Sequence, residues 1–195
     1  MCRDKWLTDV APPLGALICG DPSPFAFSLL LFAAVLACKS FQSPDKPTVL
    51  NSPDGKFQLT VPDGWSKTTD LHSKADIQAA NRSKEMYVIV LIENQDDLAK
   101  DMTLDEFTDI TRKSLMSKYG SPQASALESV SINANDARQY ELKGTKDNIS
   151  VDLIVSTVKT PTNYTQILAW TLPSKMSDNK ETLKKVTESF REVSK

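Results

Sequence analysis

The stretch Met86–Ile92, read as M-Y-V-I-V-L-I, is apolar on both alternating faces. Its short length and its β-branched residues favour a strand. Successive side chains of a strand point to opposite sides of the sheet, so both sides of this strand must be covered. A two-layer sandwich with one solvated face does not meet this requirement. The stretch therefore predicts an α+β fold with three layers (α/β/α), in which helices cover both faces of the sheet.

Further strands are predicted on both sides of this stretch. Two P-D-G turns bracket K-F-Q-L-T-V, in which Phe57, Leu59 and Val61 alternate with polar residues, as in a half-buried strand. The pattern also predicts strands at Ala75–Ala80, Ser129–Ala134, 137–142, 149–158 and 164–171. Gly144–Asn148 and Pro161–Asn163 are interpreted as the tight turns that connect the last three of these strands.

Two helices are predicted. Thr103–Glu106 has the pattern of a capping box, and Gly120 with Pro122 supplies the stop after the first helix. The second helix is predicted from about Asn179 to Val193. Its apolar residues recur at helical spacing; they are Leu183, Val186, Phe190 and Val193.

The N-terminal part of the chain has the pattern of an export signal. Phe25–Ala37 is an apolar run that stops at Cys38 and is followed by polar Lys39. The run has the length of a signal-peptide core and is too short to span a bilayer as a helix. It resembles the lipobox of bacterial lipoproteins, which implies a diacylated Cys38 and membrane attachment. We therefore predict a signal peptide over residues 1–37, a lipidated flexible tether over 38–50, and a single domain over 51–195.

Cysteine content and charge narrow the classes of function. All three cysteines, Cys2, Cys19 and Cys38, lie at or before the predicted processing site. A mature domain would then have no disulfide, no thiolate nucleophile and no cysteine metal ligand. Lysine and arginine number 23 against 25 acidic residues, and this near-neutral balance argues against a nucleic-acid-binding protein.

Two short motifs are similar to those of the PsbP-like family. They are F-Q-L-T-V-P-D-G-W at Phe57–Trp65 and V-T-E-S-F at Val186–Phe190. The resemblance implies an antiparallel sheet sandwiched by helices, and an accessory or binding protein without catalysis. Histidines proposed as metal ligands in photosystem members of the family have no matching set here, because His72 is the one histidine of the chain.

Candidate binding residues are few. Trp65, His72 and Trp170 are the residues we predict for a ligand site, although aromatic residues at strand positions are more often core residues. For His72, a surface-loop histidine is favoured over a metal or pH-sensing site, since one loop rarely supplies enough oxygen ligands. The acid pairs Asp96-Asp97 and Asp105-Glu106 are interpreted as loop and helix-start residues. We predict no cofactor and no metal site.

The function favoured by these observations is a lipid-anchored, non-catalytic accessory domain of the bacterial cell envelope. Its predicted partners are the membrane, through the lipid on Cys38, and an unidentified envelope protein, with no nucleic acid. The location is the periplasmic or extracellular face of the membrane. The alternative is a lipoprotein that binds a small ligand or a metal. A hydrolase is disfavoured because no nucleophile and base complete a site.

Overall fold

The structure is a computed structural model that describes residues 46–193. The described residues all belong to one compact unit. Cys38 and the predicted signal peptide therefore lie outside the described residues. Within residues 46–193, no helix combines the length and the apolar character that crossing a membrane requires.

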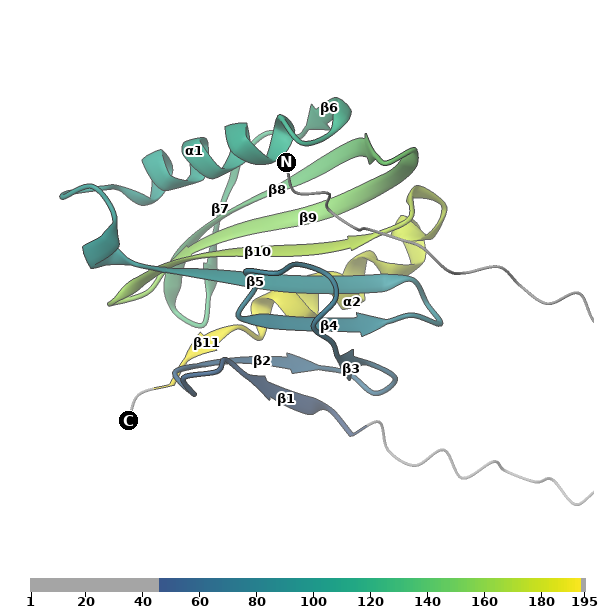
Figure 1. Cartoon of the computed structure of the whole chain (residues 1–195), viewed down its shortest axis with the longest axis horizontal. Coiled ribbons are helices and arrows are strands. Elements are labelled where there is room, and N and C mark those ends of the chain that lie inside the picture. The colour runs from purple at the N-terminus through teal and green to yellow at the C-terminus, as the bar shows by residue number, and fades with distance from the viewer. Residues whose placement is uncertain (1–45, 194–195) are drawn as a thin grey trace, which may run out of the picture. The chain divides into compact units, whose positions relative to one another are not determined.

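The described chain contains many strands and two α-helices (Figure 1). The strands are β1 (Thr48–Asn51), β2 (Phe57–Val61), β3 (Ser66–Lys67), β4 (Ile77–Asn81), β5 (Met86–Asn94), β6 (Gly120–Ala124), β7 (Glu128–Ile132), β8 (Asn135–Lys146), β9 (Ile149–Lys159), β10 (Asn163–Thr171) and β11 (Arg191–Glu192). The helices are α1 (Leu104–Met116) and α2 (Met176–Glu188), with short 3-10 helices at Gln95–Asp97 and Pro173–Lys175.

The strands form two antiparallel sheets. The larger, eight-stranded sheet has the order β3-β4-β5-β10-β9-β8-β6, and β7 also pairs with β8. The smaller sheet has the order β1-β2-β11. The predicted α+β class and the antiparallel sheet are thus confirmed. The predicted strand at Phe57–Val61 is confirmed as β2, which belongs to the smaller sheet.

Strand β5 is covered on both faces, as its apolar sequence requires. Met86, Val88 and Val90 pack in one hydrophobic cluster with residues of α2 and β2. Ile89 points to the other face and packs in a second cluster with Leu115 of α1. The cover on the α2 side therefore consists of a helix together with the small sheet (Figure 1).

The predicted capping box at the start of α1 is confirmed. The Thr103 hydroxyl accepts a hydrogen bond from the Glu106 amide at 3.2 Å, and the Glu106 carboxylate accepts from the Thr103 amide at 2.8 Å. These two bonds satisfy amides that the first helical turn leaves unpaired. The helix ends at Met116, and the predicted stop residues Gly120 and Pro122 form β6. This edge strand tolerates the proline because its register shifts between Gly120 and Gln123.

The second helix ends earlier than predicted. The Ser189 hydroxyl accepts from the Thr60 amide and lies close to the Thr60 carbonyl oxygen, at 2.9 Å in both cases. This contact fastens the chain to β2, and β11 then pairs with the same strand. Phe190 and Val193 therefore lie after α2. The prediction of a helix to Val193 was wrong because side-chain spacing alone does not reveal where a chain leaves a helix.

Two further boundaries differ from the predictions. The β8–β9 turn consists of Asp147 and Asn148, whose φ angles of +51° and +64° suit a tight hairpin turn. Gly144, predicted to lie in the link, belongs to β8. Residues 48–50, placed in the tether by the sequence pattern, form most of β1, and Leu50 is buried against the core.

Candidate functional site

The two tryptophans of the predicted ligand site lie on opposite faces of the large sheet. Trp65 is buried in the cluster on the α2 side. Trp170 packs against the cluster on the α1 side and stacks on Tyr87, with 5.4 Å between ring centroids. The structure therefore does not bring Trp65 and Trp170 to a common space.

His72 lies in the loop between β3 and β4, and its Nδ1 atom accepts from the Lys74 amide at 3.2 Å. Burial lowers the pKa of His72, and the lysines Lys118, Lys146 and Lys74 lower it further. The adjacent residue, Leu71, packs on the same cluster as Trp170. His72 and Trp170 thus belong to the same side of the sheet.

The acidic residues near His72 in the sequence bind other groups of the protein. Asp70 pairs with Arg82 at 2.7 Å, and the Asp76 carboxylate accepts from the Ile92 amide at 2.9 Å. Across residues 46–193, no group of three or more histidine, cysteine, aspartate or glutamate side chains is arranged to hold a metal ion. This arrangement offers His72 no set of converging ligands.

The helix-start acidic pair has structural contacts. Asp105 pairs with Arg138 of β8 at 2.7 Å, and Glu106 completes the capping box. The loop pair has a different setting, because Asp96 lines two surface pockets and Asp97 lines one of them. These pockets are the strongest candidate site among the described residues, and they are built by the loop between β5 and α1.

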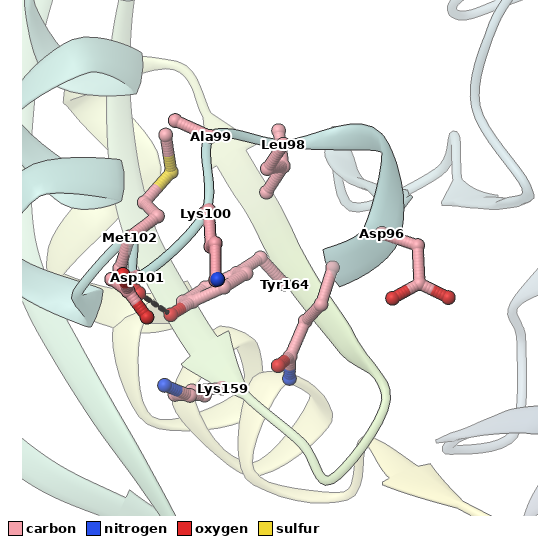
Figure 2. Close-up of a pocket in the computed structure, with 9 residues that line it drawn as sticks. Asp96, Leu98, Ala99, Lys100, Asp101, Met102, Lys159 and Tyr164 are labelled. Carbon is pink, nitrogen blue, oxygen red and sulfur yellow. Dashed lines mark hydrogen bonds between the residues drawn. The ribbon is translucent and has the colours of Figure 1, made fainter.

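The first pocket, here called the lysine pocket, has a volume of about 420 Å³ (Figure 2). Its lining residues are Gln95, Asp96, Leu98, Ala99, Lys100, Asp101, Met102, Lys159 and Tyr164. Figure 2 shows Lys100 and Lys159 extending toward Tyr164, while the Asp96 carboxylate points away from it. Figure 2 also draws Asp101 beside the Tyr164 hydroxyl, so the lining next to the tyrosine carries charges of both signs.

Tyr164 is the residue that holds this loop in place. Its hydroxyl donates to the Met102 carbonyl oxygen, and its ring stacks on Phe107 of α1 at 4.9 Å between centroids. The Lys159 ammonium lies 5.2 Å from the centre of the same ring, within the range of a cation–π contact. Gln95 adds a second tie, since its amide donates to the Thr160 carbonyl oxygen at 2.7 Å.

The second pocket, here called the carboxylate pocket, has a volume of about 770 Å³ and shares Gln95 and Asp96 with the first. It is lined by five acidic side chains and one lysine, which are Asp54, Asp76, Asp96, Asp97, Glu192 and Lys56. Burial raises the pKa of Asp76, and the Asp54 charge raises it further. The two pockets thus place positive and negative groups side by side at one end of the sheet.

One carboxylate oxygen in the second pocket has no partner. The Thr162 hydroxyl donates to Glu192 Oε1 at 2.9 Å. The other oxygen, Oε2, is covered from solvent and forms no hydrogen bond within the described residues. A covered carboxylate oxygen without a donor is energetically unfavourable. Because the oxygen is covered, a donor from outside the domain would reach it only after the atoms that cover it moved aside.

Sequence reasoning missed most of this site. Asp96 and Asp97 are adjacent in the sequence, but Lys100 and Lys159 lie far apart in it and come together only through the pairing of β9 with β10. No spacing rule connects a loop residue to the end of a distant strand. The approach of β11 to Thr162, which brings Glu192 into the pocket, is likewise a feature of the tertiary structure.

No protein-family model matches the sequence, and no curated protein matches it. Solved structures with the same fold do exist. The solution structure of cyanobacterial PsbP (CyanoP) from Synechocystis sp. PCC 6803 has a TM-score of 0.58 and 12% sequence identity. The match covers 81% of this chain and 99% of that chain.

A second similar structure is LpqN, a protein involved in cell envelope biogenesis of Mycobacterium tuberculosis. Its TM-score is 0.56 at 15% identity, over 74% of this chain and 89% of LpqN. The domain therefore has a PsbP-like fold, which confirms the fold implied by the two sequence motifs. At these identities the similarity concerns the fold alone.

Proposed function

We propose that this chain is a lipid-anchored, non-catalytic accessory domain of the cell envelope, which binds another envelope protein through the lysine and carboxylate pockets. The observation that carries the proposal is the arrangement of these pockets. Ammonium and carboxylate groups lie next to each other on exposed loops, and such a pattern suits a partner surface of complementary charge.

The envelope location is supported by two independent observations. The first is the sequence around Cys38, which resembles a lipoprotein processing site. The second is the PsbP-like fold, since CyanoP and the envelope-biogenesis protein LpqN share it. A non-catalytic role is part of this proposal, because the lining of the two pockets contains no histidine or cysteine, and the Thr162 hydroxyl is paired with Glu192.

The test is a crosslinked pull-down from detergent-solubilised membranes, followed by mass spectrometry. One variant reverses the acidic pair, with Asp96→Lys and Asp97→Lys. A second reverses the lysines, with Lys100→Glu and Lys159→Glu. The control combines Lys184→Glu and Lys185→Glu on α2, none of whose residues lines either pocket.

We expect one envelope protein to be recovered with the wild type and with the control, and to be lost with either pocket variant. Equal recovery with all four proteins would exclude the pockets as the binding surface. Mass spectrometry of the bait in the same experiment reads the acylation of Cys38, so the anchor and the partner are tested separately.

The second candidate function is binding of a small anionic ligand in the lysine pocket. Its volume lies in the range of small-molecule sites, and Lys100, Lys159 and Tyr164 supply charge and an aromatic face. A ligand at about 100 times its dissociation constant stabilises a protein by about 2.7 kcal/mol. A rise in melting temperature that is lost in the Lys100→Glu, Lys159→Glu variant would favour this function over protein binding.

A further inference from the structure

The end of the large sheet opposite the two pockets carries a row of half-buried aromatic and apolar side chains. Tyr87 of β5 and Trp170 of β10 are direct cross-strand neighbours, and their rings stack with 19° between planes. Val151 and Tyr119 pack against the same cluster on the α1 side, as does Leu71. We call these five residues the aromatic patch.

The patch continues across β8 because of one glycine. Gly144 pairs with Val151, and a Cβ atom at Gly144 would lie 2.7 Å from the Cβ of Tyr119. The missing side chain therefore lets the Tyr119 ring lie directly on the strand, level with Val151. The patch spans the sheet from β5 to β8 at the end where the β8–β9 hairpin turns (Figure 1).

Lysines border this patch on the side of α1 and the hairpin. Lys74, Lys118 and Lys146 are all exposed, and all three act electrostatically on His72. The acidic residues near the patch are Asp70, paired with Arg82, Glu85 beside Tyr87, and Asp147 in the hairpin turn.

Tyrosine and tryptophan side chains with free polar ends are typical of surfaces that contact lipid headgroups. Within residues 46–193, neither the Tyr87 hydroxyl nor the Trp170 indole N–H forms a hydrogen bond with the protein, and both rings are only half-buried. Lysines next to such rings add attraction to anionic lipids. The aromatic rings and the lysines that a contact with a membrane surface requires are therefore both present at one end of the domain.

We propose that the aromatic patch and its lysine border dock the domain on an anionic membrane surface. The proposal rests on the proposed function in one respect, namely the anchor at Cys38. Nine residues separate Cys38 from Thr48, where β1 begins, and an extended chain of that length reaches roughly 30 Å. The tether therefore keeps the domain close to the bilayer, while the two pockets, at the other end of the sheet from the patch, stay available to a protein partner.

The test uses residues 39–195, which contain no acyl chain and no signal peptide. This segment keeps the three hydrophobic clusters, since all their members lie between Leu50 and Phe190. Circular dichroism and the melting temperature verify that each protein is folded. Co-sedimentation is measured with vesicles of phosphatidylcholine and with vesicles that also contain phosphatidylglycerol.

We expect binding to the phosphatidylglycerol vesicles that weakens as salt is raised. Lys74→Glu with Lys118→Glu should weaken binding by about 30-fold or more, because two positive charges near an anionic surface become negative. The charge-matched control, Lys184→Glu with Lys185→Glu on α2, should bind like the wild type. Brominated lipids should quench Trp170, while Trp65, buried on the other face, should be unaffected.

Equal binding by the two lysine variants, or an absence of vesicle binding, would overturn the proposal. Binding to soluble polyglutamate without binding to vesicles would also overturn it, and would indicate an acidic protein partner instead. Because the segment lacks Cys38, vesicle binding is independent of lipidation. An unmodified Cys38 in cells would refute the anchor, and failed vesicle binding alone would refute the docking surface.

Discussion

The rings of Phe57 and Phe190 lie parallel, with 5.9 Å between their centroids and 5° between their planes. One ring comes from β2 of the small sheet, and the other from the segment that follows α2. Both are almost completely buried. The contact joins the last part of the described chain to one of the first strands, and thereby closes the core on the α2 side.

Replacing Phe190 by alanine should therefore lower the free energy of unfolding by about 3–5 kcal/mol, because a large buried side chain is lost and a cavity remains. Chemical denaturation measures this difference. The slope of the free energy of unfolding against denaturant concentration should be the same for the variant and the wild type. Val49→Ala is the control, since Val49 is 47% exposed and should change stability by less than about 0.5 kcal/mol. A loss below about 1 kcal/mol for Phe190→Ala would refute the proposed packing.

Gly144→Ala should destabilise the domain by about 1–3 kcal/mol, because the added methyl group would lie 2.7 Å from Tyr119 Cβ. Gly120→Ala is the matched control. A Cβ atom at Gly120 meets only the Thr145 carbonyl oxygen, at 3.5 Å, which is an ordinary contact. Thermal unfolding of the two variants compares them, and equal melting temperatures would contradict the close approach of Tyr119 to the strand.

The pKa of His72 should lie below 6.5 in the folded protein, because burial and the neighbouring lysines disfavour the protonated ring. The unfolded chain then binds more protons between the two pKa values. The contribution of His72 to stability is therefore full above pH 6.5 and is lost as pH falls through the folded pKa.

As His72 is the one histidine of the chain, proton NMR follows its ring signals without assignment. The variant Lys118→Glu should raise the pKa of His72, since a positive neighbour becomes negative. The control Lys185→Glu, on α2, should leave it unchanged. A pKa of 6.5 or above in the wild type would contradict the described surroundings of the ring.

Tyr164→Phe should destabilise the domain by about 1 kcal/mol, because the Met102 carbonyl oxygen loses its donor while the ring still stacks on Phe107. The effect should concentrate in the loop between β5 and α1. Hydrogen exchange of residues 98–103 should therefore become faster. Tyr87→Phe is the control, since its hydroxyl makes no hydrogen bond within residues 46–193. Unchanged exchange in Tyr164→Phe would show that this hydroxyl does not hold the loop.

Local sequence patterns predicted the elements that depend on interactions between residues close together in the chain. The capping box at Thr103 and the strand at Met86–Ile92 are confirmed because hydrogen bonding and side-chain alternation act over a few residues. The small sheet was missed because its existence depends on β11 returning to β2, a contact between Gln58 and Arg191 that no local pattern encodes. The lysine pocket was missed for the same reason, since Lys159 reaches the loop only through the sheet.

The central claim is that the pockets at the end of the sheet contact a protein partner in the envelope. A photo-crosslinking amino acid at Ala99, an exposed residue of the lysine pocket, tests this directly in living cells. The control carries the same group at Ser177, exposed on α2. We predict one discrete crosslinked envelope protein from position 99 and none from position 177. Identical crosslinks from both positions, or none from position 99, would contradict the claim.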